Sequence, residues 1–532
     1  MFSADFLAVV LLLILTLVAG ITFRDYGLGW DDYTHSQYGD LLLKLYGSGF
    51  ADTRALSFVN LYKYGGGFDM TAALAAKVLP FDLFETRRLI GAIVGLVGLA
   101  VTWRLARRIG GPLAGLIALA LLAACPIYYG HMFMNAKDAP FATAMIVLTY
   151  GVVRALEAYP QPDARAVALA GVGLGLAFGS RILAVIAAPT VFLALLSIVI
   201  GESRSIGFRA AATRFGQFFL ATLPALVLAY LMMGLLWPWS IVSPLNPIYA
   251  TEYFDKFFEK PWKELYEGVL IPVPNMPATY LPHLFALKLP EIMLALGTAG
   301  LIGALIAAAR KNLLLNRRAV LVTVALSAVM PIAIAMVARP ALYNGVRHFV
   351  FVIPPFAVLG GLAGAWLAGK ARPLGKAALG ALALIFIGGV TLPIIDMVRL
   401  HPYQYTAFNW VSGGVRAAHG KYMLDYWGLA FKQASNKLHA FVAAKNLQPP
   451  AGRKWVVAYC GPWAPAEVEL GKKFDTTWEV NDADFAMELG VFYCRELPAP
   501  VIADIEREGV SYARVYDLRG RTAPIPPRPG HQ

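Results

Sequence analysis

The chain has little charge and almost no cysteine. Asp, Glu, Lys and Arg together make up 15% of its 532 residues, and there are 3 cysteines. Soluble globular domains carry about 25% charged residues, so this composition excludes that class. With 58% hydrophobic residues and a mean hydropathy of +0.59, the sequence instead predicts a polytopic α-helical membrane protein.

Signatures of several well-defined sites are also missing. We find no Walker, Rossmann, zinc-finger or Ser-His-Asp pattern, and no repeat at the spacing of solenoid proteins. The two halves lack the paired broken helices of secondary transporters. Glycine clusters such as Gly171, Gly173 and Gly175 predict close helix packing, not a nucleotide site.

Long apolar runs dominate the first three quarters of the chain. Because a span needs about 20 apolar residues, we predict about eleven spans. They lie near 5–22, 88–106, 112–130, 139–155, 166–180, 182–200, 216–236, 286–308, 319–338, 348–368 and 376–395. The first run lacks the basic flank and small-residue cleavage site of a secretory signal, so we favour a retained span over that alternative.

Basic residues concentrate in alternate loops between these runs, as in Arg107 and Arg108 or Arg317 and Arg318. The positive-inside rule places those loops, and the N-terminus, in the cytoplasm. The net charge of +13 then reflects topology, because a nucleic-acid partner would need a basic face on a soluble domain. The segments that face outwards are 23–87, 131–138, 237–285, 339–347 and everything after 396.

Two outer segments are too apolar to be simple linkers. Residues Tyr33 to Tyr46 and Phe68 to Leu79 have helix-spaced apolar positions and predict amphipathic helices, lying in the membrane interface or packed on the bundle. The segment 237–285 is rich in Pro, Trp and Tyr, and it is either a lid or a crossover connection.

The composition changes after the last apolar run. We predict a membrane domain over 1–397 and a small extracytoplasmic α/β domain over 398–532, with strands at Trp455–Tyr459 and Gly490–Tyr493. The Pro-rich end from Pro524 to Pro529 predicts a disordered tail. Cys460 and Cys494 could pair in an oxidising compartment or remain free, and Cys125 is expected to be a small buried apolar residue.

The acidic pair Asp31 and Asp32 lies a few residues beyond the first span. Charge at the edge of a bilayer is costly and often functional. One of the two could simply cap a helix N-terminus, but a cap does not readily explain both. We therefore predict that one acts as a general base.

A second acidic site, Asp138, begins the fourth span on the same side of the membrane. Pro140 follows it, as is typical of a helix start, so a capping role is again the alternative. Polar and aromatic residues crowd the same short loop and would suit a sugar or a phosphate. They are Tyr128, Tyr129, His131, Asn135 and Lys137.

Several arginines lie on the outer side, against the positive-inside bias, which indicates that some of them face anions. They are Arg87, Arg88, Arg181, Arg339 and Arg347, the last followed by His348. Contact with lipid headgroups is the alternative for any one of them. Carboxylates and cations gathered at a lipid-facing cleft indicate sugar transfer from a polyprenyl-phosphate carrier.

These motifs resemble the GT-C membrane glycosyltransferases of glycosyltransferase family 39, which includes protein O-mannosyltransferases and lipid A aminoarabinose transferases. The resemblance spans the membrane part, and it rests on the order and shared side of five segments. They are Trp30–His35, Glu85–Leu89, Asn135–Pro140, Arg347–Pro355 and His401–Gly414, with a weaker similarity at Leu424–Gly428.

The resemblance implies that Asp31 is the catalytic base, that Asp32 is its companion and that Asp138 helps to position a substrate. The family more often has Glu at the position of Asp32. With these acids, the residues that we expect to contact substrate are His35, Arg88, Tyr129, His131, Lys137, Arg181, Tyr343, Arg347 and His348.

We therefore expect an inverting glycosyltransferase of the bacterial inner membrane. It would move a sugar from a polyprenyl-phosphate donor to a hydroxyl or phosphate of an envelope lipid, glycan or protein at the periplasmic face. No cofactor is required by this prediction, although the three acids could hold a hard divalent metal. The alternatives are a lipid-linked saccharide flippase and a non-catalytic assembly subunit.

Overall fold

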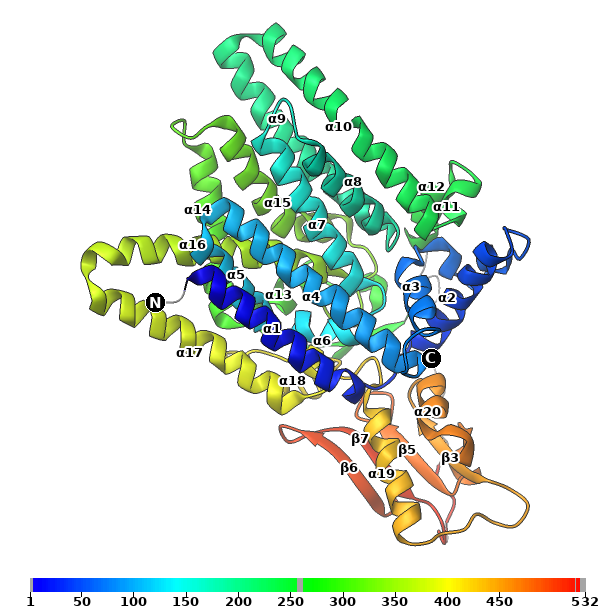
Figure 1. Cartoon of the computed structure of the whole chain (residues 1–532). Helices are drawn as coiled ribbons and strands as arrows, with labels where there is room; N and C mark the ends of the chain where they lie inside the picture. The colour runs from blue at the N-terminus through cyan, green and yellow to red at the C-terminus, as the bar shows by residue number, and fades with distance from the viewer. Residues whose placement is uncertain (1–2, 256–261, 522, 527–532) are drawn as a thin grey trace.

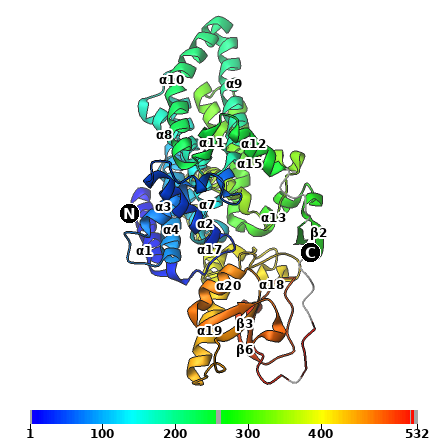
Figure 2. The same cartoon turned by 90° about the vertical axis from the view of Figure 1, so that its right-hand side faces the viewer.

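A computed structural model of the chain describes residues 3–255, 262–521 and 523–526. A bundle of long helices makes up most of the molecule, and a sheet domain packs at one end of it (Figure 1). The turn between α9 and α10 lies at the opposite end (Figures 1 and 2).

The apolar runs form the helices of the bundle. Within the described residues, nine helices are long and apolar enough to cross a membrane, or ten if the bent pair α5 and α6 counts as one span. The helix α8 is apolar but shorter, so the prediction of about eleven membrane segments is close. The helices are α1 Ala4–Thr22, α4 Leu83–Gly110, α5 Pro112–Ala123, α6 Pro126–Met134, α7 Asp138–Glu157, α8 Ala164–Phe178, α9 Ala187–Ile206, α10 Phe208–Leu236, α14 Glu291–Ala309, α15 Leu315–Ala338, α16 Ile353–Ala371 and α17 Lys376–Leu400.

The third predicted span, 112–130, is not one straight helix. The chain bends by 65° between α5 and α6, where Pro126 follows Cys125. Proline cannot donate the backbone hydrogen bond that a continuous helix needs, so the helix restarts there. The helix α6 continues to Met134, and the outer loop predicted at 131–138 shrinks to residues 135–137.

The first outer segment contains two helices where amphipathic helices were predicted, α2 Asp32–Gly47 and α3 Gly67–Ala75. They pack closely because Gly39 lies against the backbone of Asp69, where a Cβ would come within 2.3 Å of the carbonyl oxygen. The buried face of α2 carries Tyr38 and Leu42. These contacts fix the start of α2, which carries the acidic pair.

The second outer segment is more regular than its composition suggests. It contains the helices α11 Trp239–Val242 and α12 Asn246–Asp255, the hairpin of β1 Lys263–Tyr266 and β2 Val269–Pro272, and the helix α13 Tyr280–Lys288. The hairpin approaches the C-terminal part of the chain, since the Gly268 N–H donates to the Lys421 carbonyl at 3.0 Å.

After α17 the chain builds a five-stranded mixed sheet in the order β4-β3-β5-β7-β6. The strands are β3 Trp455–Cys460, β4 Phe474–Thr477, β5 Phe485–Leu489, β6 Val501–Arg507 and β7 Val510–Asp517, accompanied by the helices α18 Gly414–Ala418, α19 Ala430–Ala444 and α20 Trp463–Leu470. The predicted strand Trp455–Tyr459 coincides with β3. The α17 helix ends three residues beyond the boundary predicted at 397.

The strand predicted at Gly490–Tyr493 is wrong. The strand is β5, in which all five residues are buried, as expected for a central strand. The chain leaves the sheet after Gly490, and the Cys494 N–H donates to the Val491 carbonyl at 3.0 Å in a turn. The aromatic residues of 490–493 therefore belong to a loop.

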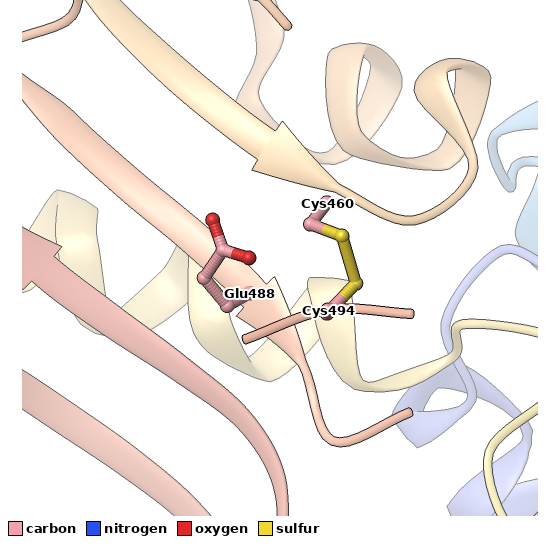
Figure 3. A group of neighbouring side chains, drawn as sticks. All are labelled: Cys460, Glu488 and Cys494. Atoms are coloured by element: carbon pink, nitrogen blue, oxygen red, sulfur yellow. A yellow bond between two sulfur atoms is a disulfide. The ribbon is translucent and has the colours of Figure 1, made fainter. Parts of the chain in front are cut away.

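Cys460 and Cys494 form a disulfide, with their Cα atoms 5.7 Å apart, and Glu488 projects from β5 beside it (Figure 3). The bond joins the end of β3 to the loop after β5. Cys125 is free and buried, as predicted.

Part of the predicted disordered tail is packed. Ile525 is buried, and its N–H and C=O groups both bond to the Asn481 side chain. An apolar side chain that covers the sheet explains why Pro524–Pro526 are ordered. The remaining predicted tail, Pro527–Pro529, lies outside the described residues.

One hydrophobic core runs from the outer ends of the membrane helices into the sheet. It includes Tyr26 and Phe133 of the bundle together with Trp427, Phe431 and Phe485 of the C-terminal part. The Tyr26 and Phe133 rings stack with centroids 4.1 Å apart. The sheet domain is therefore a fixed roof over this end of the bundle, and the acidic pair lies beneath it.

Candidate active site

The two acids of the first loop point in different directions. Asp31 precedes the first residue of α2, but its carboxylate makes no capping hydrogen bond to the described part of that helix, and 39% of its side chain is exposed. Asp32 is buried, accepts the Gly29 N–H at 2.7 Å and forms an ion pair with Arg88. Asp31 is thus the acid that faces a cavity.

Behind Asp31 lies a buried network of charged side chains. Arg87 donates to Asp69 at 2.7 Å and lies 3.6 Å from Asp32, while His35 Nδ1 lies 2.6 Å from Asp69. Burial alone would raise the pKa values of the two carboxyl groups, but Arg88 and Arg87 beside Asp32, and His35 and Arg87 beside Asp69, hold them below their usual value.

This network joins α2, α3 and α4. Arg88 and His35 were predicted to contact substrate, yet both are bonded to carboxylates inside the protein. Their position indicates that they hold the start of α2 in place, because a buried charge is stable only when it is paired.

Asp138 occupies a second polar cluster at the start of α7. It accepts the Asn135 side-chain N–H at 2.8 Å and lies 2.6 Å from the Arg181 guanidinium. The Asn135 side-chain oxygen accepts the N–H groups of Lys137 and Asp138, so Asn135, not Asp138, caps this helix. Asp138 therefore does not cap the helix, which was the alternative role predicted for it.

Two neighbours extend this cluster towards the roof. The Asn135 side-chain nitrogen lies 3.0 Å from His131 Nδ1, and the Tyr426 hydroxyl lies 3.2 Å from His131 Nε2. Both ring nitrogens of His131 are thus engaged, and a residue from beyond the last span closes the cluster.

Arg347 lies between the two acidic sites. Its guanidinium is 3.9 Å from the Asp31 carboxylate and lies over the rings of Tyr343 and Trp427, with Cζ 4.7 Å and 5.0 Å from their centroids. Its side chain is 8% exposed, and its Nε has no hydrogen-bond partner among the described residues. A buried guanidinium N–H without a partner favours an anionic ligand.

Further cations flank Arg347. The Lys137 ammonium lies 3.9 Å from the centre of the Tyr64 ring, and the Arg181 guanidinium 5.9 Å from the same centre. His348 follows Arg347, and its ring packs on Tyr343 with centroids 4.9 Å apart. Burial lowers the pKa of Lys137 to about 8; Asp31 acts in the opposite direction.

Tyr129, also predicted to contact substrate, is elsewhere. It is buried in the core that joins bundle and sheet, with its ring 5.3 Å from that of Phe133. Its position on α6 points it into this core, because the bend at Pro126 turns the helix.

Two cavities meet at this cluster. One of ≈ 210 Å³ is lined by Asp31, Arg347, Trp262, Tyr426 and Trp427, among others. The second cavity has a volume of ≈ 310 Å³. Its lining includes the polar residues Arg181 and His348 and apolar residues such as Val185 and Phe254. Tyr343 lines both cavities. The cluster thus connects a polar chamber with a partly apolar cleft.

The three acids do not form a shared metal site. Asp32 is paired with Arg88, Asp138 with Arg181, and Asp31 lies near Arg347, so each carboxylate has its own cation. Elsewhere in the described chain, Cys460, Glu488 and Cys494 lie close enough together for a metal, but the two sulfur atoms are joined in the disulfide and offer no thiolate (Figure 3).

Several residues of the chamber were not among those predicted to contact substrate. Trp262 directly precedes the hairpin, and Tyr426 and Trp427 come from the segment between α18 and α19. The only sequence signal is the aromatic motif Leu424–Gly428. Asp425 holds this turn, because its carboxylate accepts the N–H groups of residues 428–430.

Chemically, this arrangement combines an accessible carboxylate with a buried cation beside a partly apolar cleft. A carboxylate can remove a proton from an attacking hydroxyl, and a cation can stabilise a departing phosphate. An apolar cleft can hold a lipid chain.

Comparison with known proteins finds similarity to one family of sugar transferases. Residues 68–227 match the family described as dolichyl-phosphate-mannose-protein mannosyltransferase. No curated protein sequence matches the chain at a significant level.

Solved structures extend the likeness to the whole fold. Apo ArnT from Cupriavidus metallidurans is 14% identical and superposes with a TM-score of 0.50, over 96% of this chain and 97% of that one. The apo oligosaccharyltransferase of Archaeoglobus fulgidus is 12% identical, with a TM-score of 0.50, over 88% of this chain and 64% of that one. AglB from the same organism, in complex with an inhibitory peptide and a dolichol-phosphate, is 12% identical. It superposes with a TM-score of 0.50 over 90% of this chain and 69% of that one. The chain is therefore a multi-pass membrane protein with the GT-C glycosyltransferase fold.

Proposed function

We propose that the chain transfers a sugar from a polyprenyl-phosphate donor to a hydroxyl of an envelope lipid, glycan or protein at the periplasmic face of a bacterial inner membrane. The observation that carries this proposal is the approach of Asp31 and Arg347, 3.9 Å apart at one chamber. One is an accessible base, and the other is a buried cation with an unpaired N–H.

The cleft beside the chamber suits the lipid-linked donor. Its apolar wall would hold the first isoprene units, and Arg181, Lys137 and His348 would meet the phosphate. The matched family is described by its dolichyl-phosphate-mannose donor, and AglB binds a dolichol-phosphate. Both are polyprenyl phosphates, which supports a donor of this class.

In the reaction, the acceptor oxygen forms a bond to the anomeric carbon while the bond from that carbon to the phosphate oxygen breaks. The acceptor proton passes to the Asp31 carboxylate. Polyprenyl phosphate leaves with the electron pair, and its added negative charge falls near Arg347. A single displacement of this kind inverts the anomeric configuration.

Placement at the periplasmic face is supported by two features. The Cys460–Cys494 disulfide belongs to an oxidising compartment. The basic loops, such as that of Arg107 and Arg108, lie at the opposite ends of the helices, as expected for the cytoplasmic side.

The test is transfer by purified protein in lipid vesicles from a synthetic polyprenyl-phospho-sugar to an extracted envelope fraction. We expect release of polyprenyl phosphate and a new sugar on one envelope component, identified by mass spectrometry of its lipids, glycans and proteins. A purified protein that moves the intact donor between leaflets without consuming it would instead be a flippase.

Lys137 makes donor binding depend on pH. Its pKa of about 8 means that the ammonium loses its charge as the pH rises through that value. Only the charged form attracts phosphate, so the affinity for polyprenyl phosphate should fall between about pH 7 and pH 9. Lys137→Arg stays charged over this range and should give a flatter profile. Identical profiles for the two proteins in a binding titration would contradict this role.

Glu469 of the roof positions the loop that carries Asp31. Its carboxylate accepts the Leu28 N–H at 2.9 Å. Glu469→Ala removes this bond, worth about 1–3 kcal/mol, and should lower kcat about tenfold with little change in KM. Glu469→Gln keeps an accepting oxygen and should restore most of kcat. An equal loss in both variants, or a change in KM alone, would argue against positioning.

A further inference from the structure

A groove lies where the start of α2 meets the sheet domain, and Asp31 lines it whereas Arg347 does not. Its volume is ≈ 480 Å³, and its lining includes Trp30, Tyr33, Tyr459, Trp463 and Trp478 together with Asp31. Five of the eleven residues that line the groove are aromatic, and Asp31 is the charged group among them.

The aromatic side chains come from both parts of the molecule. Tyr33 of α2 meets Trp463 of α20 with centroids 5.8 Å apart at 60°, and Tyr459 meets Trp478 at 5.9 Å and 73°. Such tilted contacts leave ring surface uncovered, and Trp463 is 51% exposed. Trp30, which is 39% exposed, lines the same groove, and exposed aromatic side chains that cluster in this way favour a binding surface.

The wall of the groove is rigid. Gly461 joins β3 to α20 with φ 143°, and a Cβ there would come within 2.6 Å of Leu489 and 2.8 Å of Phe431. The adjacent Cys460 is held by the disulfide. A wall fixed in this way keeps Trp463 in place without a ligand, which lowers the entropic cost of binding.

Asp31 lines both the groove and the chamber that contains Arg347. A ligand in the groove therefore reaches the Asp31 carboxylate from a cavity that Arg347 does not line. Under the proposed function the donor phosphate lies on the side of the cation, so the groove is on the acceptor side.

We propose that this groove binds a sugar residue of the acceptor, which places one of its hydroxyls at Asp31. This inference rests on the proposed function and specifies its acceptor as a saccharide. The ring of a pyranose has an apolar face of C–H groups that packs on an aromatic side chain, and hydroxyls that donate to a carboxylate. An acyl chain would leave the carboxylate unused.

The experiment measures binding of soluble disaccharides of glucose, mannose and N-acetylglucosamine to the full-length protein by saturation-transfer NMR. We expect at least one to bind with a Kd of roughly millimolar order. Trp463→Ala should weaken that binding at least about fivefold, and Trp463→Phe, which keeps a ring, should weaken it less. Trp366→Ala is the control, because Trp366 is a tryptophan on α16 that is also more than half exposed and lies outside the groove.

Binding of polyprenyl phosphate by every variant checks that each is folded. If no disaccharide binds the wild type, or if Trp463→Ala binds as well as wild type, the inference is overturned. Binding of an acceptor peptide in the groove in place of a saccharide would overturn the inference too. Failure of the proposed function looks different: the disaccharide would bind, but no donor would be consumed with any acceptor.

Discussion

Asp31→Asn is expected to lower kcat for sugar transfer by roughly 10²–10⁴-fold, the usual contribution of a general base. The amide nearly matches the carboxylate in shape but cannot take the acceptor's proton. Because 39% of the Asp31 side chain is exposed and it caps no described helix, the substitution should leave the fold intact. The rate is measured as release of polyprenyl phosphate under saturating donor.

The matched control is Asp25→Asn. Asp25 lies six residues earlier, is half-exposed and pairs with His401, away from the chamber. The Asp25→Asn protein should transfer sugar at the wild-type rate. Asp32→Asn should act differently again, by removing a partner of the buried Arg88 and thereby lowering the melting temperature.

An Asp31→Asn protein with undiminished transfer would remove the proposed base. It would also point to a phosphate acceptor, because a phosphate oxygen needs no proton removed before it attacks. The same measurement therefore separates two acceptor chemistries.

Much of the bundle could be predicted because membrane helices follow simple rules. Each apolar run became a helix, since a backbone in lipid must satisfy its own hydrogen bonds. The break at Pro126 could not be predicted from proline alone, because Pro224, Pro331 and Pro393 lie inside the continuous helices α10, α15 and α17. The strand predicted at Gly490–Tyr493 was wrong because aromatic residues favour strands, but they also occur in loops such as this one.

The site could be predicted only in part. Topology placed Asp31, Asp138 and Arg347 on one side of the membrane. In the structure Asp31 and Arg347 line one cavity, and Asp138 pairs with Arg181, which lines the next. Which acid of the adjacent pair faces the chamber depends on rotation about the helix axis, where successive residues differ by about 100°. The pairing of Asp32 with Arg88 decides it, and that pairing joins two separate helices.

The roof residues had almost no local signal, apart from the weak similarity of Leu424–Gly428. Trp427 and Trp463 reach the site from more than 390 positions beyond Asp31, through a domain whose placement follows from the shared core. Long-range contacts of this kind depend on packing, which a single sequence does not encode in any short window.

Arg347→Ala is expected to lower kcat by roughly 10²–10³-fold, the range seen when a group that stabilises developing charge is removed. The guanidinium lies 3.9 Å from Asp31, between the rings of Tyr343 and Trp427, and its Nε is without a partner among the described residues. Negative charge on the leaving phosphate grows as the bond to the sugar breaks, so the transition state should lose more than the bound donor does. KM for the donor should therefore rise much less than kcat falls.

Arg347→Lys should recover only part of the rate, because an ammonium keeps the charge but lacks the planar fork that fits between two rings and a phosphate. Arg339→Ala is the control, since Arg339 is an exposed arginine just before the same loop and lines neither cavity. If Arg347→Ala raised KM and left kcat unchanged, Arg347 would serve only to bind the donor. The charge that forms on the leaving group would then have to be stabilised by Arg181 and Lys137, which lie beside Tyr64 on the cleft side of the chamber.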